Sequence, residues 1–293
     1  MNNSSISRRL AASIIVSLFV IGFSRLWNGR EVQTSLSAQE SALQKAEKSF
    51  AIVELFTSEG CSSCPPADAN LKRLSEFAAA KHINVIPLSF HVDYWNYLGW
   101  EDPFSDKAFS DRQIEYAKAL DQSQRIYTPQ MVVNGRYTFN GGDRKNSDKA
   151  VQLALQQPVR HHVNLKRSSH SPSSQTDSKL SDAKVLDQEA AIEVSVSLSN
   201  DAAKQNESFD SAYEVSIVTV TDNETVQVKR GENSGRALSH VWVVRSLQTV
   251  PLTNDTSSFN VSLHTAAGKH TRVVVFVQSK MSREMTGAAV LVL

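Results

Sequence analysis

The pattern of apolar and polar residues changes character near residue 158. Before that point, short runs of consecutive apolar residues alternate with stretches in which apolar residues recur every three or four positions. Continuous runs are typical of strands buried on both faces, and the wider spacing is typical of amphipathic helices. The first half is therefore predicted to be an α/β domain, with a hairpin turn at Asn134-Gly135. The expected strands are 51–56, 84–90, 131–133 and 137–139, and the expected helices are 67–82, 107–120 and 147–156.

After residue 158 the apolar residues recur with a period of two. Alternation of this kind is typical of strands with one buried face, and several such strands without a convincing helix predict an antiparallel sandwich. Residues 159–293 are thus expected to form an all-β, sandwich-like domain, and the Ser-rich segment 167–190 within it is expected to be a flexible linker. The expected strands are 192–198, 213–220, 241–247, 259–263 and 272–277, with one more at the C-terminus.

The N-terminus carries the pattern of an export signal. Residues 10–23 form an uncharged, mostly apolar run that follows Arg8 and Arg9. This run is shorter than the roughly 20 apolar residues of a spanning helix and fits the core of a signal peptide. Residues 1–27 are therefore expected to be a signal peptide or a membrane anchor, and 28–49 a polar tether. The expected location is the periplasm or cell envelope, with anchoring to the inner membrane as an open possibility.

Charge and composition exclude several classes of function. The 293 residues include 31 basic and 30 acidic side chains, which gives a net charge of +1. A balanced charge provides no basic surface for phosphate, so no nucleic acid is expected as a partner. Two cysteines are too few to staple a small disulfide scaffold. The 41% hydrophobic and 21% charged residues are typical of an ordinary globular protein.

The two cysteines, Cys61 and Cys64, lie between a predicted strand and a predicted helix. If Ser62 or Ser63 caps that helix, the two following prolines occupy its first turn, where a missing N–H breaks no helical hydrogen bond. Cys61 would then lie near the positive end of the helix dipole, which favours a thiolate. Cys64 would be close enough to attack a mixed disulfide at Cys61. These positions favour a redox role.

Three other interpretations of the cysteine pair remain open. A closed zinc site would need further ligands, and a second cysteine pair does not exist in the sequence. A structural disulfide in a non-enzymatic binding protein would close a very short loop, which stabilises little in the entropic account. A copper-binding protein or metallochaperone could use Cys61, Cys64 and His91, because some copper carriers combine two cysteines with a histidine.

The region 50–158 resembles the thioredoxin-like superfamily. Thr128-Pro129 directly precedes a predicted strand. When a proline opens a strand beside a C-x-x-C turn, a cis bond before that proline directs the chain back toward the thiols. The run ELFTSEGCSSCPPAD at 54–68, with HVDYW at 91–95 and YTPQ at 127–130, is most similar to a bacterial family of exported thioredoxin-like proteins known as a domain of unknown function. The resemblance implies a thioredoxin-like α/β domain, followed here by the sandwich-like domain.

The resemblance implies the fold, and the chemistry of the cysteine pair indicates the function. We expect thiol–disulfide exchange with protein thiols or disulfides, small thiols or a redox partner protein, through Cys61 and Cys64 and without a cofactor. Glu54 stands roughly where thioredoxins keep a buried acid, although it could be an ordinary strand residue near solvent. Thr128 and Pro129 would align the partner's chain. The dipeptide Ser62-Ser63 differs from that of thioredoxins, so the redox direction does not carry over.

Two further groups of residues call for interpretation. The aromatic side chains of the insertion 91–106 either line a peptide-binding lip or pack into a core. The pair His161-His162 is expected to mark a strand start or a surface feature. The aromatic residues in question are Trp95, Tyr97, Trp100 and Phe104.

Overall fold

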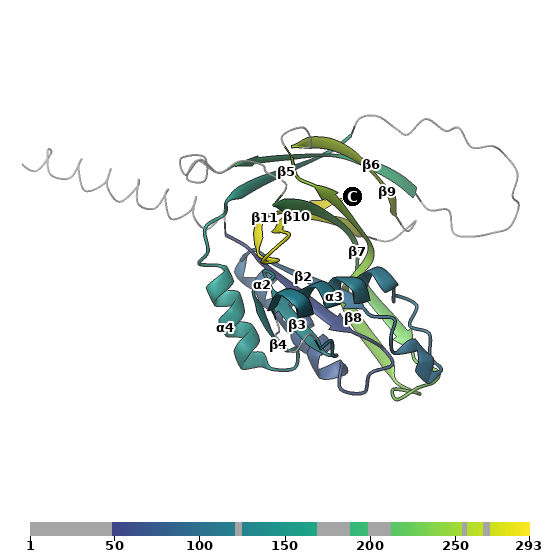
Figure 1. Cartoon of the computed structure of the whole chain (residues 1–293). Helices are drawn as coiled ribbons and strands as arrows, with labels where there is room; N and C mark the ends of the chain where they lie inside the picture. The colour runs from purple at the N-terminus through teal and green to yellow at the C-terminus, as the bar shows by residue number, and fades with distance from the viewer. Residues whose placement is uncertain (1–48, 121–124, 169–187, 199–211, 254–256, 266–269) are drawn as a thin grey trace, which may run out of the picture. The chain divides into compact units, whose positions relative to one another are not determined.

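The computed structural model contains one eight-stranded mixed sheet and one three-stranded sheet (Figure 1). It describes residues 49–120, 125–168, 188–198, 212–253, 257–265 and 270–293. The predicted signal peptide or anchor, almost all of the tether and most of the Ser-rich linker lie outside the described residues. Within the described residues, no helix is both long and apolar enough to cross a membrane.

The first half folds in the predicted order of strands and helices. Local hydrophobic periodicity was sufficient here, because each element has one consistent pattern. Observed bounds differ from the predicted ones by a few residues at most. The elements are β1 (Ala51–Thr57), α2 (Pro65–Lys81), β2 (Val85–His91), the short 3-10 helix η1 (Asn96–Leu98), α3 (Lys107–Leu120), β3 (Gln130–Val133), β4 (Tyr137–Asn140) and α4 (Arg144–Ala154).

Strand β1 lies in the middle of this half and is buried along its whole length. It pairs in parallel with β2 and antiparallel with β3. Successive side chains of a strand point to opposite faces. Val53 and Leu55 accordingly pack with residues of α2 and α4, whereas Ile52 and Phe56 pack on the other face with residues of α3. Helices therefore cover both faces, which explains the continuous apolar run in the sequence.

The predicted hairpin turn joins β3 to β4. Asn134 and Gly135 both have positive φ, 49° and 63°, which this two-residue turn requires. The Asn134 side chain also accepts a hydrogen bond from the Ile52 N–H at 2.7 Å and donates one to the Phe50 carbonyl at 3.1 Å. A Cβ at position 135 would collide with the carbonyl group of Arg283. The turn is thus held by the sheet beside it and by the C-terminal half.

All strands predicted in the second half are present. Strands β7 and β8 are each 15 residues long and extend well beyond the predicted segments, so they form a long hairpin. His161 is buried at the start of β5, and its Nδ1 lies 2.8 Å from Thr286 Oγ1, which confirms the strand-start interpretation. The strands are β5 (His161–Arg167), β6 (Gln188–Leu198), β7 (Tyr213–Gln227), β8 (Ala237–Pro251), β9 (Ser258–Thr265), β10 (Thr271–Ser279) and β11 (Met285–Val292).

The two halves share one sheet. Its strand order is β11-β10-β7-β8-β2-β1-β3-β4, and β8 pairs in parallel with β2 at Ser89 and Val243. The smaller sheet, β5-β6-β9, packs against the β7 and β10 end of the large sheet around a third apolar cluster. The predicted change from α/β to all-β elements is confirmed in element order. The structure, however, joins both sets of strands in a large mixed sheet with few helices, so the sheet continues past residue 158.

Candidate functional site

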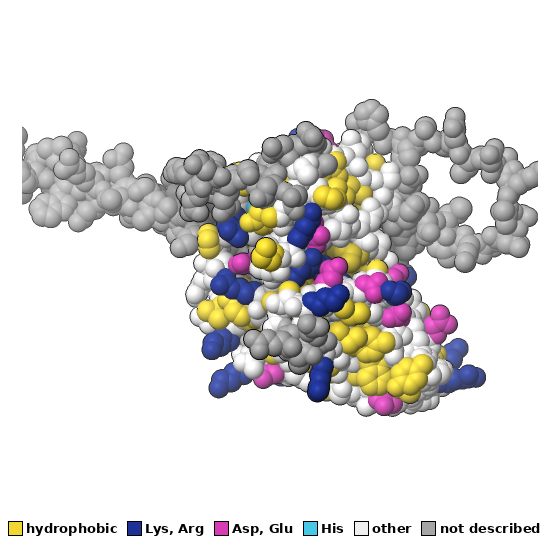
Figure 2. Space-filling model, viewed as in Figure 1, with side chains coloured by type: hydrophobic (Ala, Val, Ile, Leu, Met, Phe, Trp, Pro, Cys, Tyr) yellow, Lys and Arg dark blue, Asp and Glu magenta, His cyan; other side chains and the backbone are white. Residues whose placement is uncertain are grey.

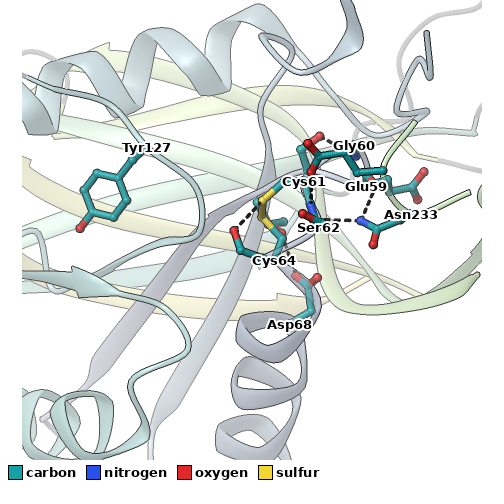
Figure 3. Close-up of a disulfide and its surroundings, with 12 residues drawn as sticks. Glu59, Gly60, Cys61, Ser62, Cys64, Asp68, Tyr127 and Asn233 are labelled. Atoms are coloured by element: carbon teal, nitrogen blue, oxygen red, sulfur yellow. Dashed lines mark hydrogen bonds between the residues drawn. A yellow bond between two sulfur atoms is a disulfide. The ribbon is translucent and has the colours of Figure 1, made fainter. Parts of the chain in front are cut away.

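Cys61 and Cys64 form a disulfide at the junction between β1 and α2 (Figure 3). The predicted position of the pair, after a buried strand and before a helix, is confirmed. Both cysteines are completely buried, with 0% of their surface exposed, whereas the intervening Ser62 and Ser63 are exposed. In this turn the two serines are therefore exposed to solvent, and the two cysteines are buried.

Helix α2 begins differently from the prediction. Pro65 and Pro66 occupy the first two helical positions, as expected. The N-cap is Cys64, without a capping hydrogen bond from its side chain, so the prediction that Ser62 or Ser63 caps the helix is wrong. Ser63 Oγ instead lies 3.3 Å from Cys61 Sγ. Pro65 and Pro66 supply no N–H, and the next two N–H groups, of Ala67 and Asp68, donate to the Cys64 carbonyl at 2.8 and 3.1 Å.

A loop from the far half of the chain is hydrogen-bonded to the cysteine turn. This 228–236 loop joins β7 to β8. The carboxylate of Glu232 accepts a hydrogen bond from the Ser62 N–H at 2.9 Å. The side-chain amide of Asn233 donates to the carbonyls of Glu59 and Cys61, each at 2.9 Å, as Figure 3 shows. Asn233 is fully buried. Sequence analysis missed this contact, because about 170 residues separate the partners and Asn233 belongs to no motif.

A buried charged cluster lies beside the turn. His240 of β8 lies with Nε2 3.5 Å from Glu59 Oε1 and Nδ1 3.8 Å from Asp68 Oδ1. Burial lowers the pKa of His240, but the hydrogen-bonding and charge interactions of Asp68 and Glu59 outweigh burial and raise it to about 10. Thr57 Oγ1 donates to Asp68 at 3.0 Å, and Trp100 Nε1 donates to Glu59 at 2.7 Å. His240 is therefore held as a cation between two carboxylates.

His91, the candidate copper ligand, belongs to the same cluster. Its Nδ1 lies 2.7 Å from Asp102 Oδ2, and its ring stands edge-on to the His240 ring at 4.6 Å. Burial raises the pKa of Asp102, but the charge and hydrogen bond of His91 produce a net lowering. Among the described residues, no group of three or more His, Cys, Asp and Glu could hold a metal ion. The structure does not assemble Cys61, Cys64 and His91 into such a group.

Glu54 is buried, so it is not an ordinary strand residue near solvent. Its carboxylate accepts hydrogen bonds from Arg112 Nε at 2.6 Å and from the Tyr116 hydroxyl, and both donors belong to α3. Glu54 thus points to the α3 face of the sheet, whereas α2 packs on the opposite face. The acid that lies one helical turn after Cys64 is Asp68, whose carboxylate points toward the disulfide in Figure 3.

The Thr128-Pro129 bond is cis, as predicted. The Pro129 carbonyl accepts a hydrogen bond from the Gly141 N–H at 3.0 Å. A Cβ at Gly141 would lie 3.5 Å from Pro129 Cβ and 3.0 Å from Ala67 Cβ. Ala67 belongs to the first turn of α2, so the cis-proline segment lies beside the start of this helix.

Three of the four aromatic residues of the insertion pack into the protein, and the fourth is exposed. Trp95 packs against Gly60, where an added Cβ would lie 3.2 Å from Trp95 Cβ. Trp100 is tied to Glu59, and the Phe104 ring stands against His91 at 5.2 Å. These three residues pack around the cysteine turn, whereas Tyr97 in η1 is 81% exposed. Figure 2 shows hydrophobic side chains gathered at the lower right of the molecule, over the segment that contains η1.

The fold and the site define a mixed α/β protein with a buried C-x-x-C disulfide at the start of a helix. The chain belongs to the family described as "Protein of unknown function (DUF1223)", which matches residues 52–206 and 172–278. No curated protein matches it.

Several solved structures are similar to this fold. A crystal structure of a protein from Agrobacterium tumefaciens is 28% identical, with a TM-score of 0.57, and the match covers 82% of this chain and 93% of that one. HBP35 of Porphyromonas gingivalis is 16% identical, with a TM-score of 0.54, and the match covers 84% of this chain and 76% of that one. The second likeness concerns the fold alone.

Proposed function

We propose that this protein is an exported thiol–disulfide oxidoreductase of the cell envelope, with a thioredoxin-like region over 50–158. The observation that carries the proposal is the Cys61–Cys64 disulfide at the start of α2, with the cis-Pro129 segment beside the same helix. A buried strand, a C-x-x-C turn, a helix and a cis-proline together are the features on which the resemblance to the superfamily rests. The substrates would be protein thiols or disulfides, or small thiols.

The proposed reaction passes through a mixed disulfide at Cys61. A substrate thiolate attacks Cys61 Sγ, the bond to Cys64 breaks, and Cys64 leaves as a thiolate that takes up a proton. A second substrate thiolate then attacks the substrate sulfur of the mixed disulfide. The substrate leaves as a disulfide, and Cys61 leaves as a thiolate. Two electrons have passed to the protein, and the reverse sequence would reduce a substrate disulfide by the same route.

The surroundings of the turn suggest roles for its neighbours. Asp68 follows Cys64 by one helical turn and is almost fully buried, so it is better situated than Glu54 to exchange a proton with Cys64. Thr128 and Pro129 would align the client's chain beside the sulfur atoms. The half-buried Trp95 and the exposed Tyr97 would contact a bound peptide next to the turn.

Trapping of clients tests the proposal. In a Cys64→Ser variant the resolving thiol is absent, so mixed disulfides between Cys61 and client proteins should accumulate in the cell envelope. They should run as high-mass bands on non-reducing gels and disappear on reduction. The matched Cys61→Ser variant retains one thiol, at Cys64, and should trap far less. Equal and negligible trapping by both variants would contradict exchange at Cys61.

One observation favours a second candidate function, a binding protein with a structural disulfide. Both cysteines are fully buried, and the 228–236 loop is hydrogen-bonded to the turn. Equilibration of the protein with glutathione redox buffers separates the two candidates. Structural disulfides typically have potentials below about −300 mV and resist the glutathione pool. An exchange-active pair should instead titrate within the range of glutathione buffers.

A further inference from the structure

The 228–236 loop uses the main-chain groups that surround Cys61. The Glu232 carboxylate accepts a hydrogen bond from the Ser62 N–H, and the Asn233 side chain donates to the carbonyls of Glu59 and Cys61. One main-chain donor and two main-chain acceptors of the turn are thus already hydrogen-bonded to the loop. An extended peptide laid along the turn would need such main-chain groups, because peptide recognition of this kind depends on backbone hydrogen bonds. The loop therefore stands where a client's backbone would bind.

Burial of the two cysteines prevents thiol–disulfide exchange in this conformation. Thiol–disulfide exchange requires direct contact between the attacking sulfur and one sulfur of the disulfide. Cys61 and Cys64 expose 0% of their surface, and Asn233, which bonds the main chain of the turn, is equally buried. An attacking thiolate cannot make that contact in this conformation. Exchange at Cys61 therefore requires a conformation in which the turn has moved and a sulfur atom is exposed.

The loop is built as a unit that could separate from the turn. Its own backbone bonds close it, from the Val228 N–H to the Arg236 carbonyl and from the Gly235 N–H to the Val228 carbonyl, both at 2.9 Å. Gly231 and Gly235 adopt positive φ on either side of Glu232 and Asn233. Glu232 is exposed, so its bond to Ser62 can exchange with water. Three hydrogen bonds to the turn, two of them from Asn233, would break on opening.

We infer that the 228–236 loop is an autoinhibitory clamp: its hydrogen bonds hold the main chain of the turn in the conformation that buries the Cys61–Cys64 disulfide, and thiols reach the disulfide only after Asn233 leaves the turn. The inference deepens the proposed function and rests on it for its biological meaning. The clamp itself can be tested separately from client exchange, because access to the disulfide is measurable with a small thiol alone.

The test compares the rate at which dithiothreitol reduces the disulfide in the full chain, followed by labelling of the released thiols. Asn233→Ala removes both donors and should raise the rate about tenfold or more, the factor expected for two lost hydrogen bonds. The matched control is Ser234→Ala, because Ser234 is exposed in the same loop and its hydroxyl bonds only within it, to the Lys229 carbonyl at 3.0 Å. This control should stay within about twofold of the wild type.

A second variant protects the test against misfolding. Glu232→Ala removes the exposed bond to Ser62, should leave the far-UV circular dichroism spectrum and melting temperature nearly unchanged, and should raise the rate by a smaller factor. Unchanged rates in both Asn233→Ala and Glu232→Ala would overturn the inference, as would an equal rise in Ser234→Ala. Faster reduction in Asn233→Ala, without client trapping by a variant that combines Asn233→Ala with Cys64→Ser, would support the clamp and contradict the oxidoreductase. Trapping together with unchanged reduction rates would do the opposite.

Discussion

Replacement of His240 by glutamine should change how stability depends on pH. His240 is 2% exposed and lies between the carboxylates of Glu59 and Asp68, with the rings of His91 and Phe104 packed against it. Its raised pKa means that the folded protein holds the proton more tightly than the unfolded chain does. This contribution is fully present below pH 6.5, and it is lost as the pH rises through about 10.

The size of the effect follows from the two pKa values. A change from 6.5 to about 10 corresponds to at most about 5 kcal/mol of stability. Between these limits, the stability of the wild type relative to His240→Gln should fall by about 1.4 kcal/mol for each pH unit. Water that enters the cluster during local opening would screen the charges and reduce this slope.

Urea unfolding with the disulfide intact measures the effect. Free energies of unfolding would be compared at pH 6.5, 8 and 9.5 for the wild type, for His240→Gln and for His270→Gln, a control that replaces an exposed histidine. The difference between wild type and His240→Gln should shrink steadily over this range. Parallel pH profiles for wild type and His240→Gln would refute the assignment of a buried histidine cation.

Further consequences concern the packing that supports the site. Arg112→Met leaves the Glu54 carboxylate buried without its cation and should cost about 3–5 kcal/mol in urea unfolding; adding Glu54→Leu should recover much of this loss, and no recovery would contradict the ion-pair account. Gly135→Ala should lower the melting temperature more than Gly99→Ala, because both have positive φ but only position 135 is crowded by a carbonyl group. Burial lowers the pKa of His161 to about 4, so stability should decline as the pH falls from 6.5 toward 4; His161→Gln should flatten this acid decline in melting temperature.

The candidate site was predictable in part. The position of the cysteine turn and the prolines at the start of α2 follow from local sequence, because each depends on neighbouring residues, whereas the cis bond before Pro129 was expected from its placement beside the C-x-x-C turn. The acid proposed to exchange a proton with Cys64, Asp68, was not among the predicted site residues. Glu54 and Asp68 are both acidic and both buried, and only the face of the sheet to which each element packs separates them.

Hydrophobic periodicity was enough to determine the order and type of the elements, since helices and strands each repeat over a few residues of the chain. Tertiary structure decided how the two halves meet. Strand β8 pairs with the free edge of β2 and continues the sheet. The local sequence pattern of a strand does not specify which other strand will pair with it. The same pairing brings His240 and the 228–236 loop to the cysteine turn. Long-range strand pairing depends on which edges remain unpaired in the folded chain, and only the assembled sheet contains that information.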